Sequence, residues 1–588
     1  MTVEKIQIDT VKPYADQRYE WVEGMAHFAV DPEHPANQRI VDLALAPRGD
    51  DGLVRFEADL RLLRPIDGGS GNLLFEVPNR GMVAGFTFGM GGDALLLDRG
   101  WTIAWCGWQW DVIRGSGGLG LDAPYSDVAP GWMRMEWRAD TPSADHSLSD
   151  SLPGLDFLRF ADYPTVDVGD PDAMLTVRTS LDGEPITLAR DTWRFTDDTH
   201  IELDGGFAAF HWYQLVYRTS RAPVAGCGLL AIRDIVSHLR GVGSRIEHAF
   251  AFGGSQSGRL LRQFLWDRLN VDEAGATVFD GVFCHIASGA RGEFNHRYAQ
   301  PSATAVIGFG NLPPFDNTGL LERQRTLGGV PKAMFTNSAS EYWLRGEGAL
   351  LHVDPNSGED LPEDPDARTY LLAGADHLGA IPFKHALPVA NPAHDLDVAP
   401  ILRALLIVLQ EWVRDGVEPP GSRVPRASDG TATNRVNVLA RFAHTARPDP
   451  AILSRARRID LGPDADRGIG RWPVRLGQPY VDLVSAVDDD GNEVAGIRLP
   501  AVTAPLATYT GWNPRRHIEG LPDVLYERIG SKAPFPPGRP LVTERYPTRH
   551  DYERAVRAAA EKLVAERFLL AGDINVAVEA AVTDYPDS

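Results

Sequence analysis

One segment of the chain has the residue types and spacing of a serine nucleophile. The sequence GGSQSG at 253–258 follows an apolar, strand-like run and precedes an amphipathic, helix-like segment. A serine on a strand-to-helix turn adopts strained backbone angles, so the residues two before and two after it must be small. Gly253 and Ser257 meet this condition for Ser255, whereas Arg259 is too bulky for Ser257 to occupy the turn. The spacing therefore predicts Ser255 as the nucleophile.

The same segment has two other interpretations, a phosphate-binding loop and an ordinary strand-to-helix turn. It departs from G-x-S-x-G because Ser257 replaces the second glycine, and it matches neither G-x-G-x-x-G nor G-x-x-x-x-G-K-[ST]. The absence of both phosphate-loop patterns favours the nucleophile. A helix that begins here would direct its first backbone N–H groups at the serine, so we expect the Gln256 N–H to stabilise an oxyanion.

A serine is a weak nucleophile, so it requires a base that takes its proton and an acid that orients the base. On a strand–turn–helix scaffold the order along the chain is serine, then carboxylate, then histidine. Among the 16 histidines, His377 follows an apolar run at 369–373 and lies in the glycine-flanked loop GADHLG. We predict that His377 is the base.

The orienting acid should follow the strand before the histidine. The strand-like run VPKAMFTN is followed by SASEYW, which contains Glu341. Asp354, Asp360 and Asp376 compete for the role. Asp376 precedes His377 directly, a position from which it would orient the imidazole ring poorly. We therefore predict Glu341 as the acid.

Other residues could complete a site around this serine. The run NLLFEVPNRG ends at Gly81, whose backbone could supply a second oxyanion donor or could serve only to turn the chain. Arg80 beside it, Arg259 one helical turn beyond Ser255, and His296 in the segment RGEFNHR could contact a polar or anionic acyl group. Arg259 and the RGEFNHR segment could instead form structural salt bridges, which is the interpretation that the sequence favours.

The elements that must position these residues follow an α/β pattern. The first seventy residues alternate polar and apolar positions, and strand-like and helix-like runs then alternate through the middle of the chain. We predict a mostly parallel sheet flanked by helices. The expected regions are a β-rich N-terminal extension at 1–70, a catalytic core at 71–418 with a long insertion at about 108–205, and a mixed C-terminal extension at 419–588 that packs on the core.

Composition limits the partners of the chain. Its 588 residues include 58 basic and 80 acidic side chains, a formal net charge of −22, and no run of Lys and Arg that would neutralise phosphates. The N-terminus lacks a signal-peptide pattern, and no stretch approaches the ~18 apolar residues of a membrane span. We expect a soluble, cytoplasmic protein that binds neither nucleic acid nor membrane.

Cysteine and metal chemistry find little support. Cys106, Cys227 and Cys284 each lie in an apolar segment, so we interpret them as small buried side chains. The sequence contains no H-E-x-x-H motif and no histidine or aspartate cluster with metal-ligand spacing. The site as predicted requires neither a metal ion nor a cofactor.

Segments from both ends of the chain resemble a family of large α/β-hydrolase-domain proteins. They are DPEHPANQRIVDLALAPR, FEVPNRG, DRGWTIAWCGWQWDV, GGSQSGRLLRQF, RGEFNHR, SEYW, GADHLG and ATYTGWNPR. The turn GGSQSGR is also similar to the G-C-S-R-x-G-K motif of glucuronoyl esterases. That similarity places the nucleophile at Ser255 and the basic position of the motif at Arg259, while Gln256 replaces its arginine.

The resemblance implies an α/β-hydrolase fold and hydrolysis of carboxylic esters or lactones. Combined with the candidate residues, it predicts a serine hydrolase that acts on a small-molecule ester or lactone through an acyl-enzyme. Two alternatives stay open, an acyltransferase that uses the same three residues and a non-catalytic binding protein on the same fold.

Overall fold

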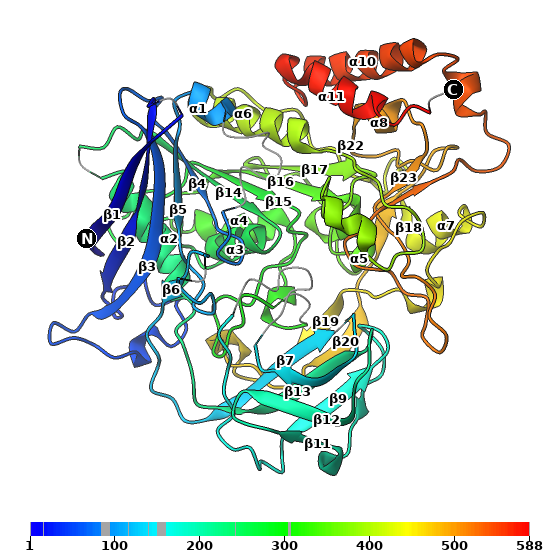
Figure 1. The fold of residues 1–588 in the computed structure, drawn as a ribbon. Coiled ribbons are helices and arrows are strands. Elements are labelled where there is room, and N and C mark those ends of the chain that lie inside the picture. Colours follow the sequence, from blue (N-terminus) through cyan, green and yellow to red (C-terminus); the bar gives the residue numbers. More distant parts are fainter. Residues whose placement is uncertain are drawn as a thin grey trace.

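A computed structural model describes residues 2–15, 17–83, 94–115, 117–138, 140–149, 160–241, 243–303 and 307–586. Its centre is an 11-stranded sheet (Figure 1). Ten strands follow in the order β1 (Val3–Tyr14), β2 (Tyr19–Val30), β3 (Val54–Pro65), β5 (Thr102–Cys106), β4 (Asn72–Glu76), β14 (His248–Gly254), β15 (Gly281–His285), β16 (Lys332–Ser338), β17 (Ala367–Ala373) and β22 (Ile497–Arg498), and β6 (Leu121–Asp122) pairs with β3.

The sheet changes from antiparallel to parallel strand pairing at β5. From β5 through β22 every neighbouring pair is parallel. On the other side of β5, the strands β1, β2 and β3 are antiparallel, so the β-rich N-terminal segment continues the same sheet. This mostly parallel sheet confirms the α/β class that the sequence predicts.

Alternation along the parallel strands explains why helices cover both faces. In β14, Ala249 and Ala251 pack on one side with Leu260 and Phe264 of α3 (Gln256–Trp266), beside α2 (Cys227–Leu239) and α4 (Asn317–Arg325). Phe250 on the opposite side packs with α6 (Ala399–Asp415), near α1 (Ala94–Asp98). The two helical layers are visible below and above the sheet in Figure 1. Both faces of the strands are therefore buried, as their continuous apolar runs indicate.

A β-rich layer comes from the predicted insertion and the residues after it. It consists of the sheets β10-β9-β13-β7 and β11-β12-β8. The strands are β7 (Gly131–Arg138), β8 (Ser143–Ser147), β9 (Met174–Arg178), β10 (Ile186–Thr187), β11 (Trp193–Phe195), β12 (His200–Phe207) and β13 (Trp212–Thr219). β9 and β10 form a hairpin whose connection contains Asp182 and Gly183, an Asp-Gly pair that is typical of hairpin turns. Residues 150–159 of the insertion lie outside the described part.

The C-terminal segment combines short strands and helices. Apart from β22, its elements are β18 (Ala432–Asn434), α7 (Arg435–Ala440), β19 (Arg457–Asp460), β20 (Arg475–Pro479), β21 (Leu483–Ser485), α8 (Pro500–Thr503), β23 (Thr508–Thr510), β24 (Ser531–Ala533), α9 (Val542–Arg545), α10 (Arg549–Ala565) and α11 (Ile574–Val582). Leu563 of α10 packs in the same cluster as α6, so this segment is joined to the core. Among the described helices, none has the length and hydropathy that a membrane span needs.

The connection between β14 and α3 is a single residue. Ser255 has φ 57° and ψ −116°, a conformation that is strained for any residue with a side chain. Its N–H donates to the carbonyl of His285 (2.8 Å) and its carbonyl accepts the Arg259 N–H (2.9 Å). A Cβ on Gly253 would lie 2.5 Å from the carbonyl oxygen of Ser257, whereas a Cβ on Gly254 would have no atom within 4 Å.

This difference predicts opposite outcomes for two neighbouring glycines. Gly253→Ala should destabilise the fold by about 1–3 kcal/mol, because the added methyl group collides with the helix backbone. Gly254→Ala should leave the melting temperature close to wild type, because its Cβ points into open space. Thermal unfolding of both variants checks this. Equal destabilisation by the two substitutions would contradict the close approach of strand and helix at Gly253.

Candidate active site

Three side chains that the sequence singled out form one hydrogen-bonded chain. The Ser255 Oγ lies 2.9 Å from the His377 Nε2, and the His377 Nδ1 lies 2.5 Å from the Glu341 Oε1. The residues come from loops or helix starts that directly follow β14, β16 and β17. Because β14, β16 and β17 are parallel strands of one sheet with only β15 between β14 and β16, their carboxyl ends meet at one edge of the sheet, and this brings the three side chains together.

Glu341 is held at both of its oxygens. It occupies the first turn of α5 (Ala339–Leu344), where its Oε2 accepts the backbone N–H and the hydroxyl of Ser338, both at 2.7 Å. Burial raises the pKa of Glu341, but His377 and Ser338 outweigh burial and hold the pKa below its usual range. The carboxylate therefore stays ionised and keeps its Oε1 on the imidazole.

The loop that carries His377 is tied down on both sides of the histidine. The N–H of Gly374 donates to a side-chain carboxyl oxygen of Glu493 (2.8 Å). Asp376, the rejected candidate for the acid, accepts the N–H of Gly530 (3.0 Å) and lies 3.1 Å from the Nζ of Lys384. The Asp376–Lys384 pair is fully buried, so it serves to position the loop.

A second histidine lies behind this group. His285, the last residue of β15, has its Nδ1 2.8 Å from the Thr336 hydroxyl, and its carbonyl accepts the Ser255 N–H. Burial, with a smaller contribution from the charge of His377, lowers the pKa of His285 to about 3 and keeps its imidazole neutral. Sequence reasoning missed His285, although its place at the end of the strand after the serine was a usable signal.

The turn after β4 contacts the nucleophile turn directly. Asn79 and Met82 exchange two backbone hydrogen bonds of 2.9 Å, and the two central residues have positive φ, 51° at Arg80 and 79° at Gly81. Two such residues in a row form a type I′ turn, which favours glycine. The Asn79 side chain donates to the carbonyl of Gly254 (2.9 Å). The turn is thereby fixed against the start of α3.

The predicted oxyanion donors lie on these two turns. The backbone N–H of Arg80 donates to the side-chain oxygen of Gln256 (3.0 Å), so Arg80 itself is engaged. The backbone N–H groups of Gln256 and Gly81 donate to no acceptor within the described residues. Both are thus available to an added oxygen atom, and their role as an oxyanion hole stays a prediction.

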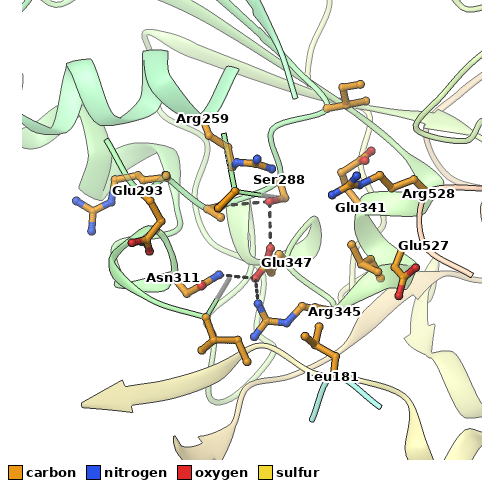
Figure 2. Close-up of a pocket in the computed structure, with 18 of the residues that line it drawn as sticks. Leu181, Arg259, Ser288, Glu293, Asn311, Glu341, Arg345, Glu347, Glu527 and Arg528 are labelled. Carbon is orange, nitrogen blue, oxygen red and sulfur yellow. Dashed lines mark hydrogen bonds and ion pairs between the residues drawn. The ribbon is translucent and has the colours of Figure 1, made fainter. Parts of the chain in front are cut away.

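A pocket of about 120 Å³ opens beside the histidine, and Figure 2 shows its lining. His377, Glu341 and Arg259 contribute from the core. Leu181 and Trp212 contribute from the β-rich layer, and the C-terminal segment adds Glu527 and Arg528 just before β24. Distant parts of the chain therefore enclose one site.

Two predicted substrate-binding residues are absent from this lining. The Arg80 side chain is buried and donates to the carbonyl of Ser302 (3.2 Å). His296 has its Nε2 2.5 Å from a carboxylate oxygen of Glu293 and stacks on Phe309. Burial raises the pKa of Glu293, but His296, Arg134 and the Gly310 N–H together lower it to about 2. Arg80 and His296 support the pocket from behind, and Arg259 alone of the three lines it.

The fold and the site define a class of protein. A serine on a strand-to-helix turn, followed by a carboxylate and a histidine after later strands of a mostly parallel sheet, is the arrangement of the α/β hydrolases. Residues 172–579 match a family described as "Alpha/beta hydrolase domain". The match covers more than half of the chain, and the chain belongs to this family.

Membership confirms the resemblance to α/β-hydrolase-domain proteins and the predicted fold, and it indicates a hydrolase-type function. A comparison with curated proteins found no match. In the described part of the chain, no three His, Cys, Asp or Glu side chains are grouped as a metal ion would require.

The anchor of the histidine loop predicts a pH-dependent stability. Burial raises the pKa of Glu493 from 4.5 to about 7. Between these values the folded state holds a proton that the unfolded state has lost, so stability falls as pH rises through this window. Glu493→Gln removes the titration and keeps an acceptor for the Gly374 N–H. The variant should gain on wild type by about 3 kcal/mol between about pH 4 and about pH 8.

Urea unfolding at both pH values measures this gain. The exposed pair of Arg55 and Asp51 offers a control, since Asp51→Asn should not gain stability relative to wild type as pH rises. A stability difference between Glu493→Gln and wild type that is the same at both pH values would contradict a protonated, buried Glu493.

Proposed function

We propose that the chain is a serine hydrolase that cleaves a carboxylic ester or lactone through an acyl-enzyme. The observation that carries this proposal is the continuous hydrogen-bonded chain from Ser255 through His377 to Glu341 beside a pocket. A serine with an adjacent, oriented imidazole is an activated nucleophile, and acyl transfer is the chemistry that such a group performs.

In the first half of the proposed reaction, the His377 Nε2 takes the hydroxyl proton as the Ser255 Oγ attacks the ester carbonyl. The tetrahedral oxygen accepts hydrogen bonds from backbone N–H groups, for which Gln256 and Gly81 are the candidates. His377 then gives its proton to the departing alkoxide, and the alcohol leaves. Glu341 accepts a hydrogen bond from the Nδ1–H throughout and stabilises the imidazolium.

In the second half, His377 takes a proton from water, and the resulting hydroxide attacks the acyl carbonyl. The bond to the Ser255 Oγ breaks, the serine recovers its proton from His377, and the carboxylic acid is released. For a lactone, acid and alcohol leave as one hydroxy acid. Proton and bond balance require water alone as the second substrate.

Removal of the nucleophile tests the proposal. In a panel of p-nitrophenyl esters and lactones, Ser255→Ala should lower kcat by several orders of magnitude, on the order of 10⁶ in a comparable serine triad. Ser257→Ala is the matched control, because within the described residues the Ser257 hydroxyl forms hydrogen bonds only with the backbone of Gly254 (2.9 and 3.0 Å). Hydrolysis that persists in Ser255→Ala would contradict the proposal. Loss of activity in Ser257→Ala with activity retained in Ser255→Ala would also contradict it.

The role of Glu341 has its own test. In Glu341→Gln an amide faces the imidazole and favours the wrong tautomer, so kcat should fall by about 10⁴, as for the equivalent change in a comparable triad. Glu411→Gln on the outer side of α6 is a control, since Glu411 pairs with Arg567 far along the chain from the site. Steady-state kinetics measure both variants. A Glu341→Gln enzyme within tenfold of wild type would assign the orienting role to another acid.

A further inference from the structure

The pocket contains four glutamates, and each is matched by a basic group. The pairs are Glu341 with His377, Glu293 with His296, Glu347 with Arg345, and Glu527 with Arg138. Glu347 also accepts hydrogen bonds from Ser288 and Asn311, which are drawn in Figure 2. Each carboxylate of the lining therefore already has a hydrogen-bonding or ion-pair partner within the protein.

The positive charge of Arg259 is not matched in this way. Its side chain lines the pocket but makes no hydrogen bond or ion pair with any described residue, contrary to the salt bridge that the sequence favoured. Arg291, another arginine of the lining, differs, because it donates to the carbonyl of Leu312 (3.0 Å) and stacks on Trp266. Arg259 thus presents to the cavity a guanidinium that has no hydrogen-bonding partner among the described residues (Figure 2).

The Arg259 side chain is half-buried at the cavity. A partly desolvated charge that has no hydrogen-bonding partner in the protein is available to a ligand of opposite charge. Burial and the nearby charge of Arg528 outweigh the charges of Glu347 and Glu341 and lower the pKa of Arg259 to about 10, which leaves it protonated at neutral pH. The whole chain carries a charge of −22, so an anion must be recognised locally.

The position of Arg259 indicates which part of a substrate it meets. It lies in the first turn of α3, which begins directly after Ser255, and it lines the same pocket as His377, whose Nε2 lies 2.9 Å from the Ser255 Oγ. An acyl group that is attached to Ser255 and enters this pocket therefore reaches the guanidinium. The pocket of about 120 Å³ is close to the cavity of about 150 Å³ that holds a benzene molecule, so the attached group is short.

Given the proposed function, on which this inference rests, we propose that the substrate acyl group carries a free carboxylate that Arg259 binds. The substrate is then a monoester, or a carboxylated lactone, of a short dicarboxylic acid. A guanidinium binds a carboxylate through two parallel hydrogen bonds, which would hold the acyl group in place through both halves of the reaction.

Matched substrates test the specificity. Wild type should cleave p-nitrophenyl hydrogen adipate with a higher kcat/KM than its neutral methyl ester. In Arg259→Gln the ratio of the two kcat/KM values should fall about 10- to 100-fold, the effect of losing a hydrogen bond to a charged group. Arg259→Lys should restore part of the ratio, and Arg55→Gln, far from the pocket, should not change it. A ratio that is unaffected in Arg259→Gln overturns the proposal.

A third ester locates the carboxylate. 4-Carboxyphenyl acetate carries the negative charge on the alcohol side, and its kcat/KM relative to phenyl acetate should not depend on Arg259. Dependence on Arg259 for this ester alone would overturn the assignment to the acyl group.

Binding without catalysis separates this inference from the proposed function. Calorimetry with adipate should show binding to Ser255→Ala and a Kd at least 10-fold weaker in Ser255→Ala/Arg259→Gln. If adipate binding depends on Arg259 but no ester is cleaved, the proposed function fails and the carboxylate site stands. If neutral esters are cleaved through Ser255 but adipate binds equally well with and without Arg259, the proposed carboxylate site is wrong and the proposed function stands.

Thermal unfolding distinguishes a ligand-binding arginine from a structural one. Arg262 on the same helix is buried and donates to Asn317 and to the carbonyls of Gly289 and Phe315. Arg262→Gln should therefore lower the melting temperature, whereas Arg259→Gln should leave it unchanged or raise it. A clear loss of stability in Arg259→Gln would show that Arg259 has a structural role and would overturn the proposal.

Discussion

The strained backbone of Ser255 is the constraint on which the site depends. One residue with φ 57° joins a buried strand to a helix and leaves the serine half-buried at the edge of the sheet. The strain is offset by contacts around it: the carbonyl of His285 on one side, the close approach of Gly253 to the helix, and the Asn79 amide on the carbonyl of Gly254. Parallel pairing of β14 with β4 and β15 sets the distances between these partners.

The same edge of the sheet explains the other two residues. β16 and β17 end beside β14 and β15, so the α5 first turn and the loop after β17 bring Glu341 and His377 to the serine. The C-terminal segment completes the arrangement from the outside. A Cβ on Gly511 would lie 2.3 Å from Ala339 in α5, and Gly530 donates to Asp376 in the histidine loop. The core and the C-terminal segment therefore both position residues of the same site.

The sequence predicts the strand-to-helix turn at Ser255 because the requirement there is local: small residues two positions away on either side of a turn. It predicts that Glu341 and His377 follow strand ends because both come after strongly apolar runs. The α/β class followed from the same runs. These predictions depend on neighbours within a few residues, and periodicity reports such neighbours well.

The features that were missed depend on contacts between distant segments. Asp376 and Lys384 form a buried pair only once the loop has folded, and Glu493 meets Gly374 across more than one hundred residues. The environment of Arg259 also depends on distant segments. The sequence favours a salt bridge for this arginine, but in the structure the glutamates of the pocket, such as Glu341 and Glu347, pair with other residues.

Covalent labelling is the direct test of whether Ser255 is the activated nucleophile that we propose. A fluorophosphonate reacts with a serine whose proton is taken by an oriented imidazole, and peptide mass spectrometry identifies the modified residue. The account predicts one adduct, on the peptide that contains Ser255, and greatly slowed labelling when His377 is replaced by alanine. An adduct on any other residue, or labelling of Ser255 at the same rate without His377, would contradict it.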